Sequence, residues 1–387
     1  NLLEIPCKTF GYSRLLGHLR EQNFNTVDLK IDFHQESNTH VIFWEHIGVN
    51  YYDVKNIFNC LLYRPKNKIF LVIDDTYEGL LTEENIKEID SLFSENDMKY
   101  CIVSSNYKLQ GINVLHYNYN LVYKKFDGID IQKDQTKFNL QPRKKKFLCL
   151  NRQARFHRFE TVDFLIKKNL TKDTYVSLSN DGIDTASKKK QDISKDIINM
   201  YEQNSVLDYN IIEKQLSNDT FTRLNKVLPL DLDIDNWQKF TQDWKHLPNP
   251  DKFFSESYWS LITERDFYSD EYEGYTEKVL KSFFYRHPFI VIGLPYTLAK
   301  LRNLGFVTFS CVIDESYDLE ENHDKRKKLI YKEIEKLAKL NYVEHFNMYH
   351  SIKNILDYNR QHFIRLNSTS IPSQLINRLQ EWYLHAL

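Results

Sequence analysis

Glycine and paired cysteines are scarce in this chain, and each scarcity excludes a class of protein. Among the 387 residues there are 10 glycines, and no GxGxxG, P-loop or GxSxG motif occurs. This argues against the phosphate loops of kinases and dehydrogenases and against a nucleophile-elbow hydrolase. The five cysteines are scattered and form no CxxC pair, so neither a disulfide framework nor a zinc knuckle is expected. The cysteine pattern predicts a reducing compartment, with the cytoplasm as the expected location.

Long apolar runs and an excess of one charge are also missing. The longest apolar stretches, such as Phe289–Leu294, are far shorter than a membrane span, so no transmembrane segment is expected. With 52 basic and 53 acidic residues the net charge is −1, which does not indicate a general polyanion binder but leaves a local basic cleft open. The 13 histidines show no HExxH or paired ligand spacing, and we expect no metal site.

What remains is the composition of a folded protein, with 42% apolar and 27% charged residues, and a length that predicts two domains. Short runs rich in β-branched and aromatic residues alternate with stretches of helical periodicity, which predicts parallel sheets flanked by helices. The strands are expected at Val41–Trp44, Ile69–Ile73, Tyr100–Ser104, Val114–His116, Lys146–Leu150, Tyr175–Leu178, Trp259–Thr263, Phe289–Gly293 and Val307–Phe309. The helices are expected at Thr82–Asn96, Gln153–Lys168, Thr276–Tyr285, Tyr296–Leu304, Lys325–Leu340 and around Ile352–Gln361.

The alternation divides the chain into two α/β halves. We expect a Rossmann-like domain over residues 1–143 and a second over 144–370, with an irregular insertion at 181–254. The basic stretch Gln141–Lys146 is interpreted as a solvated linker, and residues 371–387 as a terminal helix that packs back towards the first domain. Because ligands of open α/β sheets bind at the carboxyl ends of strands, the cleft between the halves is the expected site.

Three clusters follow predicted strands of the second half. The first, Asn151–Arg158, places Arg152, Arg155 and Arg158 at the start of a helix. Basic groups there oppose the helix dipole, so a bound anion would explain them. Surface arginines that pair with acids elsewhere are the alternative.

The second and third clusters lie further along the chain. Glu264 follows a strand, and Thr276 is the expected N-cap of a helix whose first turn holds Glu277 and Lys278. A carboxylate there can bind ribose hydroxyls and an ammonium can neutralise a diphosphate, while ordinary helix capping is the simpler alternative. Gly293 follows the next strand and permits close backbone approach.

This order of motifs resembles the donor-binding half of GT-B glycosyltransferases of the fucosyltransferase-like group, particularly versions carried by large DNA viruses and phages. The matching segments are Leu150–Arg158, Ile262–Arg265, Tyr275–Lys281, His287–Gly293, Leu304–Phe309 and Ile313–Asp318. The resemblance covers roughly residues 146–340. It implies two Rossmann-like domains that face a cleft, with the donor bound by the second, and a location in the host cytoplasm if the protein is viral.

The resemblance also implies the activity and the roles of the site residues. The expected reaction transfers a sugar from a nucleotide-sugar donor to an acceptor hydroxyl, with inversion and without a metal or cofactor. Glu277 would hold the ribose and Lys278 would face the diphosphate. Arg152 and Arg155 would stabilise the departing nucleotide, and Glu264 would line the sugar or ribose pocket. The expected acceptor is a glycan or glycoprotein.

An inverting transfer needs a carboxylate base for the acceptor hydroxyl. Glu78 and Asp75, which follow the predicted strand Ile69–Ile73, are the first candidates, and Glu45 is the alternative. Each acid could equally be a solvated loop residue or a helix cap.

Two other functions remain open. One is a phage-type transferase that glycosylates a modified DNA base, which would need a basic acceptor face with aromatic residues. The other is an inactive protein that kept the fold as a structural or binding module.

Overall fold

Parallel β-sheets flanked by helices make up both structural units of the chain in this computed structural model. The first unit comprises Asn1–Val122, Asp270–Gly274 and Thr369–Leu387, and the second comprises Tyr123–Ser269 and Tyr275–Ser368. The predicted α/β, Rossmann-like class is confirmed. The structure describes residues 8–10, 27–28, 40–45, 69–76, 81–118, 125–126, 129–131, 141–153, 155–181, 250–268, 274–369, 375, 377–378 and 381.

The first unit contains a parallel sheet with the strand order β2-β1-β3-β4-β5-β6. Its strands are β1 (Lys8–Phe10), β2 (Val27–Asp28), β3 (His40–Glu45), β4 (Ile69–Asp75), β5 (Lys99–Ser104) and β6 (Val114–His116). The apolar runs that predict β3 to β6 therefore form the neighbouring strands of one parallel sheet, and residues 70–75 of β4 and 100–104 of β5 are buried, as expected for parallel strands covered on both faces.

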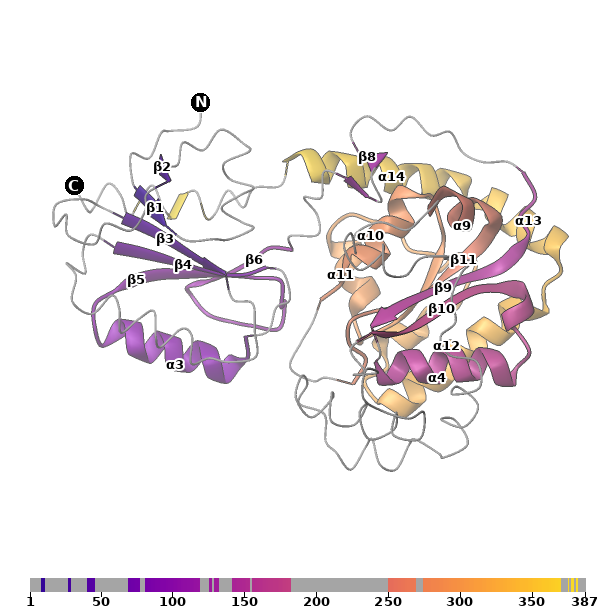
Figure 1. Ribbon diagram of the computed structural model, residues 1–387, viewed down its shortest axis with the longest axis horizontal. Coiled ribbons are helices and arrows are strands. Elements are labelled where there is room, and N and C mark those ends of the chain that lie inside the picture. Colours follow the sequence, from indigo (N-terminus) through magenta and orange to yellow (C-terminus); the bar gives the residue numbers. More distant parts are fainter. Residues whose placement is uncertain are drawn as a thin grey trace. The chain divides into compact units, whose positions relative to one another are not determined.

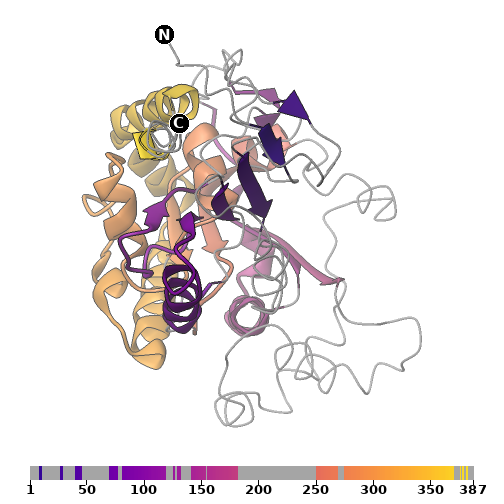
Figure 2. The same ribbon diagram turned by 90° about the vertical axis from the view of Figure 1, so that its left-hand side faces the viewer.

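Helix α3 (Glu83–Ser94) covers one face of this sheet (Figures 1 and 2). Thr82 caps its N-terminus in a capping box with Asn85, so the helix begins where the sequence predicts. Its apolar positions Ile86, Ile89 and Phe93 are buried in one cluster with residues of β4 and β5. The periodicity of the segment therefore gives both the helix and the face that it buries.

The second unit contains a four-stranded parallel sheet with the order β10-β9-β11-β12. The strands are β9 (Lys145–Gln153), β10 (Thr174–Asp181), β11 (Ser257–Thr263) and β12 (Phe289–Ile292). The chain passes from β9 outward to β10 and then crosses to β11 on the other side of β9. The order in which the chain adds strands thus reverses between β9 and β11, and open α/β sheets bind ligands at this point, outside the carboxyl ends of the strands.

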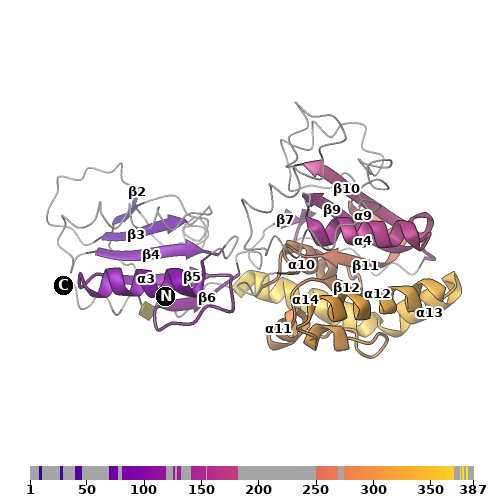
Figure 3. The same cartoon turned by 90° about the horizontal axis from the view of Figure 1, so that it is seen from below.

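Helices lie on both faces of this second sheet. In Figure 1, α4 and α12 lie on one side of the strands, and α9 and α10 on the other. Figure 3 shows α12, α13 and α14 together beyond the β12 edge. The helices are α4 (Phe156–Lys167), α9 (Pro250–Glu256), α10 (Glu277–Phe284), α11 (Thr297–Asn303), α12 (His323–Lys339), α13 (Tyr342–Ser351) and α14 (Lys353–Thr369). Two 3₁₀ turns, Thr171–Asp173 and Ser316–Leu319, and a small antiparallel pair, β7 (Lys125–Phe126) and β8 (Ile129–Asp130), complete the described elements of this unit.

The predicted strand Val307–Phe309 is wrong, because its backbone is bound by side chains. The Val307 N–H donates to Asn359 Oδ1 at 2.9 Å, and the Asn359 amide donates to the Val307 carbonyl at 2.7 Å. The Phe309 N–H donates to Glu315 Oε1 at 2.6 Å. Groups that a sheet ladder would use are thus satisfied by two side chains, one six residues away and one 52 residues away along the chain.

The solvated linker predicted at Gln141–Lys146 is wrong for Arg143 and Lys146, which are buried, while residues 141, 142 and 144 are exposed. Arg143 is buried at 5% exposure, and its guanidinium lies 3.9 Å from the centre of the Tyr349 ring. It donates to the Phe254 carbonyl at 2.5 Å and to that of Ser257. Cation–π contact and carbonyl partners place this basic residue inside the second unit, whose residues begin at Tyr123.

Two further predicted segments fall mainly outside the described residues. The irregular insertion at 181–254 is described only at 181 and from 250 onward, and the terminal segment 371–387 only at 375, 377–378 and 381. Those four terminal positions are helical. Arg378 donates to the carbonyl of Ile112 at 2.6 Å within the first unit.

Candidate functional site

The carboxyl ends of β9 and β11 meet at the reversal point of the second sheet, and Asn151 joins them. Its amide donates to the Ser177 carbonyl of β10 at 3.0 Å, and its Oδ1 accepts from the Thr263 hydroxyl of β11. A buried amide that is bonded to both neighbouring strands holds three strand ends in register. Arg152 is the next residue of β9, and its side chain lies outside the described part of the structure.

The start of α4 is tied to the end of β11. Arg155 is the N-cap of α4, and Arg158 lies one turn later. The Arg158 guanidinium donates to the Glu264 carbonyl at 3.1 Å, and His157 Nε2 lies 2.9 Å from the same oxygen. Burial, followed by the charge of Arg158, lowers the pKa of His157 well below its usual value. The imidazole is therefore neutral and donates from Nε2, and Arg158 supplies a buried positive charge.

The Glu264 carboxylate closes the connection between β11 and α10. Thr276 donates to it twice, from its N–H to Oε1 at 3.1 Å and from its hydroxyl to Oε2 at 2.6 Å. The side chain is 3% exposed, and burial raises its pKa. Both oxygens are engaged within the protein, which fits a residue that shapes the α10 N-terminus better than one that lines a sugar pocket.

Gly293 provides the room for this carboxylate. A Cβ at position 293 would lie 3.1 Å from Glu264 Cβ and 3.1 Å from Val291 Cγ1. Both distances are tighter than ordinary van der Waals contact, so a larger residue would press on Glu264. The glycine acts through packing here, as the sequence suggests for a close backbone approach.

Lys278, in the first turn of α10, reaches back to the end of β11. Its ammonium donates to the Thr263 carbonyl at 2.6 Å. Its pKa is lowered to about 7, chiefly by burial and then by the nearby charges of Arg158 and Arg155. Glu264 and Glu277 oppose this effect because their negative charges raise the pKa. The side chains of Arg158 and Lys278 thus converge on the end of β11, and the charge of Arg155, the N-cap of α4, also acts on Lys278.

Glu277 is available beside this cationic cluster. It occupies the first position of α10, is partly exposed, and makes no hydrogen bond or ion pair with the described residues. The predicted donor residues Asn151, Arg155, Glu264, Thr276, Lys278 and Gly293 therefore meet Glu277 at one edge of one sheet. These residues are up to 142 positions apart in the sequence, from Asn151 to Gly293, and the topology of the sheet brings them to the same edge.

Arg326 is a residue near this edge that the sequence interpretation missed. It is 1% exposed and donates from Nε to the Gly293 carbonyl at 3.1 Å and from Nη2 to the Phe267 carbonyl at 2.5 Å. It also donates to the carbonyls of Glu320 and Glu321, just before α12. Arg326 precedes Ile330 and Ile334 at spacings of four, so the helical register places it on the buried face. This spacing could have indicated a buried arginine, but Arg326 lies in a run of basic residues that is typical of an exposed helix face.

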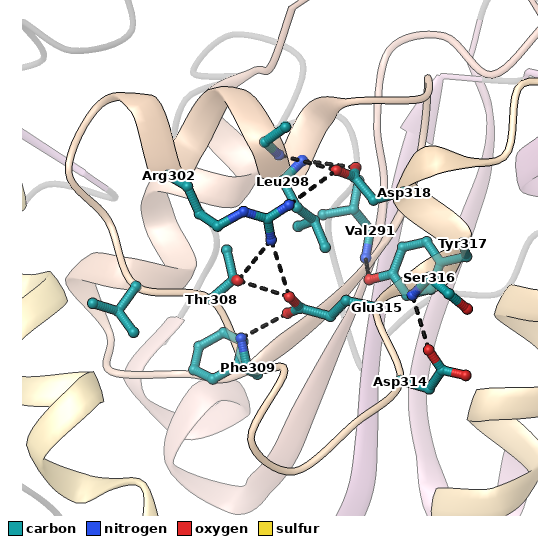
Figure 4. A network of polar contacts seen from close by, with 12 residues as sticks. Val291, Leu298, Arg302, Thr308, Phe309, Asp314, Glu315, Ser316, Tyr317 and Asp318 are labelled. Carbon is teal, nitrogen blue, oxygen red and sulfur yellow. Dashed lines mark hydrogen bonds and ion pairs between the residues drawn. The ribbon is translucent and has the colours of Figure 1, made fainter.

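A second polar network lies beyond β12, where Arg302 of α11 holds two acids (Figure 4). Its Nη1 is 3.1 Å from Glu315 Oε2, and its Nη2 is 3.5 Å from Asp318 Oδ2. Asp318 accepts from the N–H groups of Leu298 at 2.8 Å and Ala299 at 2.9 Å. An acid from a later turn thus satisfies the N-terminus of α11, and the network is structural.

In the first unit, the predicted base Asp75 is the last residue of β4 and is 0% exposed. Its Oδ2 accepts from the Ser104 hydroxyl at 2.6 Å and from the Leu81 N–H at 3.4 Å. These contacts fit a residue that ties β4 to β5 and not a base that meets an acceptor. Glu78, the other first candidate, lies outside the described residues, and Glu45 ends β3 without a described side chain.

No group of three or more His, Cys, Asp or Glu that could hold a metal ion occurs among the described residues. None of the described helices is long and apolar enough to cross a membrane. Comparisons with protein-family models, curated proteins and solved structures returned no match for this chain.

Proposed function

We propose that this protein is a glycosyltransferase that moves a sugar from a nucleotide-sugar donor to an acceptor hydroxyl. The supporting observation is the convergence of Arg155, Arg158 and Lys278 at the carboxyl ends of β9 and β11. Burial and mutual repulsion lower the pKa of Lys278, cations perturbed in this way are typical of functional sites, and a bound anion would offset the repulsion.

The proposed chemistry follows from these charges. Departure of a nucleoside diphosphate develops negative charge on its phosphate oxygens, and fixed cationic groups stabilise that charge more strongly in the transition state than in the bound donor. Lys278 and Arg155 are assigned to the diphosphate, with Arg152 as the further arginine that the sequence predicts. The N–H groups of the first turn of α10 add favourable dipoles for the same anion.

The nucleoside is assigned to Glu277. A carboxylate can accept hydrogen bonds from both ribose hydroxyls, and Glu277 has no hydrogen-bond partner among the described residues. Glu264, in contrast, is assigned to holding Thr276 and hence the start of α10. This division replaces the role in the pocket that the resemblance suggests for Glu264.

The proposal extends to the GT-B organisation, in which a second Rossmann-like domain binds the acceptor, here a glycan or glycoprotein. Glu78 is the proposed base, because the contacts of Asp75 engage its carboxylate inside the sheet. Replacing Glu78 with Gln is expected to abolish sugar transfer while donor binding persists, which a transfer assay and a binding assay together would measure.

Thermal unfolding with nucleoside diphosphates tests the proposal directly. A ligand that binds only the folded state increases the free energy of unfolding by mass action, by about 2.7 kcal/mol when its concentration is a hundred times its Kd. The melting temperature rises as a consequence. We expect GDP, UDP, ADP or CDP to raise the melting temperature, with one base preferred. If none of them does so, donor binding is contradicted and the inactive-module alternative is favoured.

A matched pair of variants makes the test specific. Lys278→Met keeps the length of the side chain and removes a charge whose pKa is already lowered by burial and by Arg158. We expect the free energy of unfolding of the unliganded variant to lie within about 1 kcal/mol of the wild-type value. The rise in melting temperature that a nucleotide causes in the wild type should disappear. Lys252→Met, at an exposed lysine of the same unit, should keep the shift in full.

A further inference from the structure

Five exposed lysines form a single stripe along α12. At 100° per residue their Cα positions fall within an arc of about 80°, over a length of about 21 Å. The buried residues Ile330, Ile334 and Leu337 lie on the opposite side of the helix. The lysine stripe consists of Lys325, Lys328, Lys332, Lys336 and Lys339.

The charge of the lysine stripe is largely uncompensated by the described residues. Lys336 is 3.2 Å from Glu333, and the other four lysines make no ion pair with any described residue. The charges of Lys336 and Lys332 contribute to lowering the pKa of the exposed Asp314. The stripe therefore presents several positive charges along one side of a rigid rod.

The other acids of α12 are engaged by lysines outside the stripe. Glu335 is 2.7 Å from Lys168, and Asp324 is 3.5 Å from Lys327. Pairing of acids at i, i+3 and i, i+4 would normally neutralise a solvated helix face. Here the pairing leaves the stripe positive, and an anionic partner would complement it.

We propose that the lysine stripe is a docking surface for a membrane that contains anionic phospholipids. Clusters of four to eight basic residues on an amphipathic helix are attracted to such membranes at about 1 kcal/mol per residue, or about fivefold in partition. A membrane presents an extended negative plane, which a straight stripe of charges can meet along its whole length.

Two details favour a membrane over a nucleic acid. All five residues are lysines, whose compact ammonium groups act as point charges, whereas nucleic-acid recognition makes frequent use of the planar fork of arginine. Large apolar side chains are exposed just before and just after the helix, Leu319 at 62% and Val343 at 67%. Exposed apolar side chains close in sequence to a basic stretch favour contact with a lipid surface.

Co-sedimentation with lipid vesicles tests this inference independently of the proposed activity. We expect the protein to bind vesicles of phosphatidylcholine mixed with phosphatidylserine, to bind pure phosphatidylcholine much more weakly, and to be released by high salt. The triple variant Lys328→Gln, Lys332→Gln, Lys339→Gln should lose about a hundredfold in partition. These side chains are exposed, so its melting temperature should match that of wild type.

A control variant removes the same number of positive charges at positions outside the stripe. Lys87, Lys172 and Lys252 are exposed and make no ion pair with described residues, and their triple Gln variant should bind vesicles as wild type does. Equal losses in the two triple variants would overturn the inference, as would equal binding to both lipid mixtures. Retention on duplex DNA without binding to phosphatidylserine vesicles would overturn it in favour of a nucleic acid.

Discussion

At the scale of single residues, Lys278 and Arg158 are the most informative side chains, because Arg158 is a buried cation and Lys278 is a half-buried cation close to it. Burial and the charge of Arg158 both lower the pKa of Lys278. Ionisable residues whose surroundings disfavour their charged form concentrate at functional sites. The lowered pKa also makes a prediction about pH.

We predict that nucleoside diphosphate binding weakens as the pH rises above about 7. The pKa of Lys278 is lowered to about 7 in the unliganded protein, so the ammonium that pairs with the diphosphate is lost above this pH. Each further pH unit costs up to about tenfold in affinity until the pKa of the bound state is reached. Calorimetric titrations from neutral to alkaline pH measure the slope. Lys278→Arg, whose charge does not titrate there, should bind with little dependence on pH.

Three buried histidines predict a loss of stability in acid. The pKa of His345 is lowered to about 4, chiefly by burial, and the pKa values of His157 and His287 are lowered well below the usual value. The unfolded chain binds protons below about pH 6.5 while the folded protein does not, so unfolding is favoured as the pH falls. Each histidine contributes about 2 kcal/mol of loss between about pH 6.5 and pH 5.

Urea unfolding across this pH range checks the prediction. His345→Gln, which removes a titrating group, should flatten the dependence by one histidine's share. The same pH dependence in His345→Gln as in wild type would contradict the assignment of the loss to that residue.

At the scale of elements, the helices around the candidate site begin where acids from other segments bind their N-terminal groups. Glu264 holds Thr276 before α10, and Asp318 holds the first turn of α11. The positions of these helices therefore depend on side chains that are distant in the sequence.

Replacing Asp318 with Ala should destabilise the protein by about 1–3 kcal/mol, because it leaves the N–H groups of Leu298 and Ala299 without their acceptor. Asp314→Ala is the matched control: Asp314 is exposed, and the Ser316 N–H donates to it at 2.9 Å. The control should cost less than about 1 kcal/mol. Chemical unfolding of both variants measures the difference, and equal losses would contradict the structural role of Asp318.

The elements themselves are largely predictable from sequence, and the exceptions have physical causes. Periodicity gives α3, which begins directly after Thr82, and the predicted N-cap Thr276 gives the start of α10. The segment Val307–Phe309 has the composition of a strand but is bound by the Asn359 side chain. Arg143 belongs to a charge run that looks solvated, yet it is buried against Tyr349. Such contacts are set by tertiary structure and leave no local pattern.

The candidate site follows a similar division. The sequence predicts that Asn151, Lys278 and Gly293 serve one site, and the crossing from β10 to β11 places their strand ends at one edge. The sequence cannot show that Glu264 is engaged by Thr276 or that Asp75 is engaged by Ser104, because both depend on side-chain geometry.

At the scale of the whole molecule, two units with separate sheets predict separate responses to a ligand. Hydrogen exchange should show that a nucleoside diphosphate protects amides at the ends of β9 and β11 and in the first turn of α10. Amides of β4 and β5 in the first unit should exchange at unchanged rates, because binding stabilises the element that it contacts against local opening. Protection confined to β4 and β5 would place the nucleotide in the first unit instead.

The central claim is that the carboxyl edge of β9 and β11 binds a nucleoside diphosphate. The most direct measurement is a crystal structure of the protein with the nucleotide that gives the largest rise in melting temperature. We predict diphosphate oxygens within hydrogen-bond distance of Lys278 Nζ and the Arg155 guanidinium, with Glu277 at the ribose. A nucleotide bound elsewhere, with Lys278 still donating only to Thr263, would contradict the account.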